Sequence, residues 1–206
     1  MSQNPHENPV DSFWHRRLGP RLGTIALFLI EVLQIIVVAA AIVIPIRYFL
    51  IYPFVVKGES MEPNFYNNEY LIIDELSYRF RDPQRGEIVV FRPPVAKDDF
   101  YIKRIVGLPG ETVEVKDGKV FVSNLEFPNG KELEESYLHE PTTNRAKKIM
   151  GEHEYFVMGD NRDESLDSRS FGPILRRAIV GRVWIRGLPL SRFSLFPPPA
   201  YNLNHP

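Results

Sequence analysis

One long apolar segment, residues 25–46 (IALFLIEVLQIIVVAAAIVIPI), sets the first limit on how this chain folds. Only Glu31, Gln34 and Pro45 interrupt it. As an α-helix rising about 1.5 Å per residue it spans roughly 33 Å, enough to cross a hydrocarbon core of about 30 Å. A buried core helix is rarely apolar on all sides over such a length, and a cleaved signal peptide has a shorter apolar stretch of about 7–15 residues. We therefore predict a transmembrane helix over residues 24–46.

The residues before the span are polar and contain several prolines, so we expect residues 1–23 to form a short flexible tail. Arginines at positions 16, 17 and 21 precede the span, whereas Arg47 and Lys57 follow it. The positive-inside bias therefore favours a cytoplasmic N-terminus. Glu31 and Gln34 share a helix face. Glu31 either reaches the headgroups or stays protonated, or this face contacts another membrane helix.

Beyond the span the pattern changes to short strands, so residues 47–206 are expected to form a mostly β domain with an antiparallel sheet. A further hairpin is expected over Glu111–Asn124, because Asp117-Gly118 tolerates the positive φ of a tight turn. The charged stretch from about 126 to 152 has no clear period and is interpreted as a surface insertion, and the proline-rich tail from Phe196 cannot enter a sheet interior. The other segments with strand-forming composition are Tyr70–Asp74, Glu87–Phe91, Phe100–Val106, His153–Met158 and Ala178–Arg186.

The overall composition excludes several kinds of function. Lys and Arg total 25 against 26 Asp and Glu, a formal charge of −1, whereas a nucleic-acid binder normally carries a basic excess. There is no cysteine, which removes disulfides, thiolate nucleophiles and cysteine-ligated metals. The acidic stretch at residues 160–169 lacks the ligand spacing of an EF-hand. We expect neither a metal nor a cofactor.

A lysine in the middle of a predicted strand is the first candidate for chemistry. Side chains alternate along a strand, so Tyr101, Lys103 and Ile105 share one face. On an inward face the ammonium would be desolvated, which lowers its pKa and prepares the amine as a general base. The alternative is that Lys103 reaches the surface while Arg104 points inward.

The second candidate is Ser60, which follows Gly58 in a segment where glycine and proline force a turn. A nucleophilic serine needs such an exposed bend with backbone N–H groups nearby, although a purely structural turn serine fits the same pattern. His6 and His15 precede the apolar segment, His205 lies near the end of the sequence, and the remaining two histidines, at positions 139 and 153, have no motif around them, so a histidine-based triad is poorly supported. The charged segment from Asp160 to Arg169 is either a solvated loop or a buried network, with Asp167 and Arg169 as a possible ion pair.

Three motifs in this order resemble bacterial type I signal peptidases, or leader peptidases. They are Gly58-Glu-Ser-Met-Glu-Pro63, Tyr101-Ile-Lys-Arg-Ile-Val-Gly-Leu-Pro-Gly110 and Gly159-Asp-Asn-Arg-Asp-Glu-Ser-Leu-Asp-Ser-Arg169, all of which follow the apolar segment. The resemblance runs from about Arg47 to Trp184. It implies a signal-peptidase type of β domain and a serine endopeptidase that removes signal peptides from exported preproteins.

The resemblance also implies roles for individual residues. Ser60 matches the nucleophile, Lys103 the neutral lysine that accepts its proton, and Ser165 a serine that orients the lysine. Asp160, Asp167 and Arg169 match the residues that support the site, and the backbone N–H of Ser60, with that of Gly58, would bind the oxyanion. Shallow apolar pockets for small residues at −1 and −3 of the cleavage site would be lined by Phe54, Val56, Met61, Phe65, Tyr101 and Ile102.

Two positions depart from the family pattern, and other interpretations remain. Some members carry a serine at the position of Gly58, and Asn64 replaces a more usual threonine, which we expect to affect only the turn. Self-cleaving repressors of the SOS-response type share a Ser/Lys β core, but the apolar segment at residues 25–46 excludes them. An inactive membrane-tethered β module remains the alternative.

The resemblance also implies a location and partners. The expected location is the bacterial cytoplasmic membrane, single-pass and with an extracytoplasmic catalytic domain. The expected partners are preproteins and the lipid bilayer, with no nucleic acid and a monomer favoured.

Overall fold

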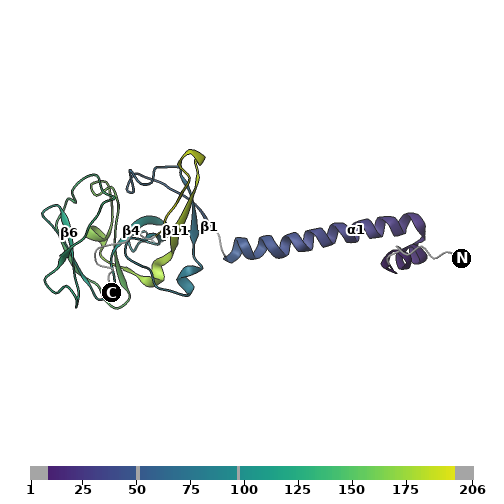
Figure 1. The fold of residues 1–206 in the computed structure, drawn as a ribbon, viewed down its shortest axis with the longest axis horizontal. Helices are drawn as coiled ribbons and strands as arrows, with labels where there is room; N and C mark the ends of the chain where they lie inside the picture. Colours follow the sequence, from purple (N-terminus) through teal and green to yellow (C-terminus); the bar gives the residue numbers. More distant parts are fainter. Residues whose placement is uncertain (1–8, 50–51, 97, 198–206) are drawn as a thin grey trace. The chain divides into compact units, whose positions relative to one another are not determined.

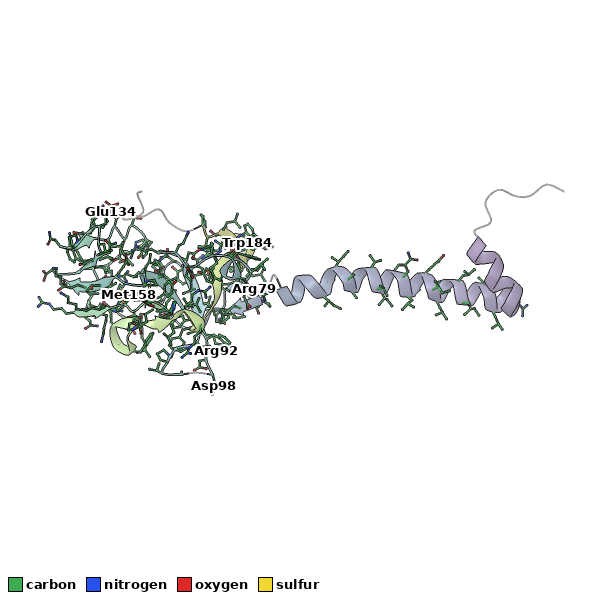
Figure 2. All side chains as sticks on the ribbon, turned by 90° about the horizontal axis from the view of Figure 1, so that it is seen from below. Arg79, Arg92, Asp98, Glu134, Met158 and Trp184 are labelled. Carbon is green, nitrogen blue, oxygen red and sulfur yellow. The ribbon has the colours of Figure 1, made fainter. Side chains whose placement is uncertain are left out.

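The computed structural model describes residues 9–49, 52–96 and 98–197, which belong to two compact units divided between Tyr48 and Phe49. The first unit is built on helix α1 (Pro9–Phe49). Within α1, the stretch Arg21–Ile44 has 24 residues and a mean hydropathy of 2.9, so by length and composition it can cross a membrane. No part of its most apolar window is buried, and Figure 2 shows side chains projecting from both sides of the helix.

The prediction of a flexible tail is wrong for residues 9–23, which are helical, whereas residues 1–8 lie outside the described residues. Pro9 does not prevent a helix here, because it occupies the first helical position, where a missing N–H removes no helical hydrogen bond. Gly19 interrupts α1 with φ +79°, a conformation that glycine adopts without steric cost.

The second unit is mostly β, as the sequence predicted, and it contains two antiparallel sheets (Figure 1). The larger sheet has the strand order β1-β2-β11-β3-β4-β9-β10, and β12 pairs with β11. Its strands are β1 (Tyr52–Val55), β2 (Tyr70–Asp74), β3 (Ile88–Phe91), β4 (Tyr101–Gly107), β9 (Glu154–Met158), β10 (Ile174–Leu175), β11 (Ile179–Leu188) and β12 (Ser194–Leu195). The short helices of this unit are η1 (Ser77–Arg79), α2 (Ser168–Phe171), η2 (Arg176–Ala178) and η3 (Leu190–Arg192).

The smaller sheet has the order β7-β6-β5-β8. Its central hairpin is the predicted one, with β5 (Thr112–Lys116) and β6 (Lys119–Ser123) joined at Asp117 and Gly118, both at positive φ. The stretch interpreted as a surface insertion supplies the outer strands, β7 (Lys131–Glu132) and β8 (Ala146–Ile149). These two strands were not predicted, because their side chains are largely exposed and charged, without an apolar alternation.

Burial on both faces of the larger sheet decides the orientation of the candidate lysine. Every residue of β3 is buried, and so are all residues of β4 after Tyr101. Lys103 and Arg104 point to opposite faces by strand alternation, yet their exposed fractions are only 4% and 6%. The sequence posed these two orientations as alternatives, whereas the structure buries both side chains.

Candidate active site

The structure brings the two main candidate residues into contact. Ser60 lies in the turn that follows β1, and Lys103 lies 43 residues later on β4. The Lys103 Nζ atom lies 2.6 Å from the Ser60 Oγ atom and donates a second hydrogen bond of 3.0 Å to the carbonyl of Ile102. An amine this close to a hydroxyl is placed to take its proton.

The environment of Lys103 favours the neutral amine that a base requires. Burial lowers the pKa of Lys103 from 10.5 to about 8, and the nearby Arg169 guanidinium acts in the same direction. The carboxylates of Asp167 and Asp160 oppose this by stabilising the ammonium, but desolvation outweighs them. The direction of this pKa shift matches the sequence-based expectation for a desolvated lysine.

Two hydrogen bonds from one asparagine hold the backbone on which Ser60 lies. The Asn161 N–H donates to the carbonyl of Ser60 over 3.1 Å, and Asn161 Nδ2 donates to the carbonyl of Glu59 over 3.2 Å. Asn161 therefore ties the Ser60 turn to the charged segment 159–169. This role could not be predicted from the sequence, since nothing local to Asn161 indicates a partner 102 residues earlier in the chain.

A buried ion pair joins the same charged segment to the lysine strand. Arg104, next to Lys103, donates Nε to Asp160 Oδ1 over 2.8 Å and Nη2 to Asp160 Oδ2 over 2.6 Å. The Asp160 side chain is fully buried. Bidentate pairs of this kind fix geometry as well as charge, so Asp160 holds its neighbour Asn161 at a set position relative to β4.

The predicted pair of Asp167 and Arg169 also forms. Asp167 is completely buried and caps α2, and its carboxylate accepts Arg169 Nε over 2.9 Å and Nη2 over 2.8 Å. The same carboxylate accepts the N–H of Gly159 over 3.1 Å. Asp160, Asp167 and Arg169 therefore belong to a buried network, whereas Asp163 and Glu164 of the same segment are exposed.

Three of the six candidate substrate-binding residues border the site. A cavity of about 590 Å³ opens over Ser60 and Lys103, and its lining includes Phe54, Tyr101 and Ile102. Exposed charges stand along it too, among them Asp98, which lies at the outer edge of the β-rich unit in Figure 2. The remaining lining residues are Val55, Lys57, Gly58, Glu59, Asp99, Phe100, Glu164 and Leu166.

Three other candidates for substrate binding do not line this cavity. Val56, Met61 and Phe65 are at most 1% exposed and pack in a core cluster with residues of β2, β3 and β11. Phe65 also packs on Phe196, with ring centroids 4.6 Å apart. Their apolar side chains pack the Ser60 turn against the sheet. The motif alone does not show that these side chains are buried.

Two expected contacts of the site differ in the structure. The Ser165 hydroxyl was expected to orient Lys103, but its Oγ is buried and makes no hydrogen bond within the described part of the chain. It packs instead beside Gly159, where a Cβ atom would overlap both Ser165 Oγ and the Ser60 carbonyl. The Gly58 N–H, expected at the oxyanion, donates to Asn67 Oδ1 over 3.3 Å.

The region from 126 to 152 reaches the site through residues that the sequence did not indicate. Glu135 forms an ion pair with the buried Arg162, which also donates to Thr142. Tyr137 lies over the guanidinium of Arg104, 3.9 Å from ring centroid to Cζ. The insertion thus supports the charged segment, and only the three-dimensional contacts reveal this.

A hydroxyl next to a buried, partly neutral amine, at the edge of an open cavity, is the arrangement of a nucleophile paired with a base. Comparisons with known proteins point to the same class. The family model described as signal peptidase, peptidase S26, matches residues 29–187. The chain therefore belongs to the signal peptidase family and is a peptidase.

Individual relatives agree with the family match. The chain is 40% identical to a probable signal peptidase I-2 of Synechocystis sp., over 81% of this chain and 76% of the relative. It is 36% identical to a signal peptidase I of Leptolyngbya laminosa, over 84% and 87%. It is 33% identical to a signal peptidase IB of Staphylococcus aureus, over 85% and 95%. A solved signal peptidase I of Enterococcus faecalis is 33% identical with a TM-score of 0.43, over 50% of this chain and 97% of that one.

Proposed function

We propose that this chain is a membrane-anchored serine endopeptidase that removes signal peptides from exported preproteins with Ser60 as nucleophile and Lys103 as base. The observation that carries the proposal is the 2.6 Å contact between Ser60 Oγ and Lys103 Nζ. The signal peptidase membership of the chain supplies the substrate class.

The proposed reaction has two steps. Ser60 Oγ bonds to the scissile carbonyl carbon while its proton passes to Lys103 Nζ, and Nζ then delivers that proton to the nitrogen of the leaving chain as the peptide bond breaks. In the second step Nζ takes a proton from water, the hydroxide oxygen bonds to the acyl carbon, and the ester breaks as Ser60 recovers its proton. The mature protein leaves first and the signal peptide second.

The oxyanion would be held by backbone donors. The N–H of Ser60 makes no hydrogen bond among the described residues, so it is free to serve. The N–H of Gly58 contributes only after leaving Asn67, with which its hydrogen bond is long at 3.3 Å. Specificity for small residues at −1 and −3 would come from the cavity walls at Phe54, Tyr101 and Ile102, since a shallow apolar wall rejects bulk by overlap.

The lowered pKa of Lys103 predicts the pH dependence of cleavage. Only the neutral amine accepts the Ser60 proton, and its fraction rises with pH through the pKa of about 8. The rate should therefore increase by about tenfold between pH 7 and pH 9 and then level off. Cleavage of a purified preprotein with an Ala-x-Ala site, with products identified by mass, measures this. A rate that is already maximal at pH 6 would contradict the role of Lys103.

The domain organisation is part of the same proposal: a cytoplasmic tail over residues 1–23, a membrane span over 24–46 and an extracytoplasmic domain over 47–206. Because the chain has no cysteine, single cysteines report topology without background labelling. A membrane-impermeant maleimide should label Ser170→Cys in intact spheroplasts but Ser2→Cys only after lysis. The reverse pattern would overturn the orientation, and labelling of both before lysis would overturn the span.

A further inference from the structure

Asn64 joins three separate parts of the β-rich unit. Its Nδ2 group donates to Asp160 Oδ2 over 2.9 Å and to the Tyr137 carbonyl over 3.1 Å. These partners lie 96 and 73 residues away, in the charged segment and in the region 126–152. An amide nitrogen has two N–H groups, so this single side chain satisfies both acceptors. A threonine hydroxyl, the more usual group at this position, has only one hydrogen to donate.

Asp160 accepts hydrogen bonds both from the turn that carries Ser60 and from the strand that carries Lys103. One of its carboxylate oxygens accepts both Asn64, from the turn that carries Ser60, and Arg104, from the strand that carries Lys103. Its neighbour Asn161 donates to the Ser60 carbonyl. The turn is thus attached to the charged segment on both sides of Ser60, at Asn161 on one side and at Asn64 on the other. Without Asn64 the second attachment is lost.

We propose that Asn64 is a positioning residue for peptide cleavage: its two hydrogen bonds, to Asp160 and to the Tyr137 carbonyl, fix the Ser60 turn relative to Lys103. This inference rests on the proposed function, since it assigns Asn64 to the Ser60–Lys103 pair. It also gives the region 126–152 a role, because the Tyr137 carbonyl comes from there. A loss of attachment of this kind misplaces the nucleophile without removing any substrate contact, so it lowers kcat and leaves KM unchanged.

The test compares full-length Asn64→Ala and Asn64→Thr with Asn124→Ala in detergent. Asn124 is a matched control, since its amide also makes several hydrogen bonds, to Glu111 and to the N–H groups of Glu126 and Phe127, but outside the site. We expect Asn64→Ala to lose at least about tenfold in kcat with KM within about twofold, and Asn64→Thr to recover part of the loss through its one donor. Asn124→Ala should lower Tm and leave kcat within about twofold.

A second measurement does not depend on cleavage. Titration of ¹³Cε-labelled lysines by NMR follows Lys103 directly, and its pKa should rise in Asn64→Ala because a loosened turn admits water to Nζ. If wild type cleaves no preprotein, the proposed function fails and this titration alone decides the inference. Unchanged kcat in Asn64→Ala, a loss no larger than that of Asn124→Ala, or an unchanged Lys103 pKa would each overturn the positioning role.

Discussion

Replacing Ser60 with alanine should reduce the rate of preprotein cleavage by at least about 10³-fold, because it removes the hydroxyl that lies 2.6 Å from Lys103 Nζ and would form the acyl-enzyme. The expected change is in kcat, with the substrate still bound, since the cavity walls at Phe54 and Tyr101 are untouched. Single-turnover cleavage of an Ala-x-Ala preprotein, followed by gel and mass spectrometry, measures the effect. Binding of the uncleaved preprotein to the variant checks that the cavity remains.

The matched control is Ser170→Ala, which removes an exposed hydroxyl from α2 and should leave cleavage unchanged. If Ser60→Ala cut as fast as wild type, the nucleophile would be another group. If wild type itself were folded and inert, the inactive tethered module would become the better interpretation of the fold.

Replacing Lys103 with methionine should abolish cleavage and at the same time stabilise the folded protein. The pKa of Lys103 is about 8 in the folded protein and 10.5 as a free side chain. The folded protein therefore binds the proton of Lys103 less tightly than the unfolded chain does. The difference corresponds to a cost of about 3 kcal/mol for burying the ammonium. Methionine fills a similar volume without a charge. Urea unfolding across pH measures the free energy of unfolding.

The change of wild-type stability with pH follows from proton binding at Lys103. Between pH 8 and pH 10.5 the unfolded chain binds more protons at this lysine than the folded chain, so wild-type stability rises across this window. The advantage of Lys103→Met is therefore largest below pH 8 and disappears above about pH 10.5. Lys148→Met, at an exposed position on β8, is the control and should change neither stability nor activity. A variant less stable than wild type at pH 7 would show that Lys103 is not held in a desolvated state.

Much of the local structure could be predicted from the sequence. The hairpin of β5 and β6 was readable because Asp117-Gly118 and the alternating residues around it specify both turn and strands within a dozen residues. The strands β2, β3, β4, β9 and β11 were readable for the same reason, since each carries its own β-branched or aromatic pattern. The short strands β1, β7, β8, β10 and β12 were missed, because none has more than four residues, too few to show a clear apolar alternation.

The residues of the candidate site likewise fall into those that local motifs predict and those whose partners lie far away in the sequence. Ser60, Lys103, Asp160, Asp167 and Arg169 were identified from motifs, but their partners were not all foreseen. Asp167 pairs with Arg169, two residues away, and this local pair was predictable. The partners of Arg162 and Asn161 lie 27 and 102 residues away, at Glu135 and Glu59, and no local pattern specifies them.

By itself, the sequence determined one apolar segment long enough for a membrane, a β-rich remainder and a set of reactive residue types in a recognisable order, since these depend on local composition and spacing. Only the tertiary structure decided that Ser60 meets Lys103, that both Lys103 and Arg104 are buried, and that Val56, Met61 and Phe65 belong to the core. The reason is that desolvation, ion pairing and reactive geometry depend on which distant segments pack together, and packing is a property of the folded chain as a whole.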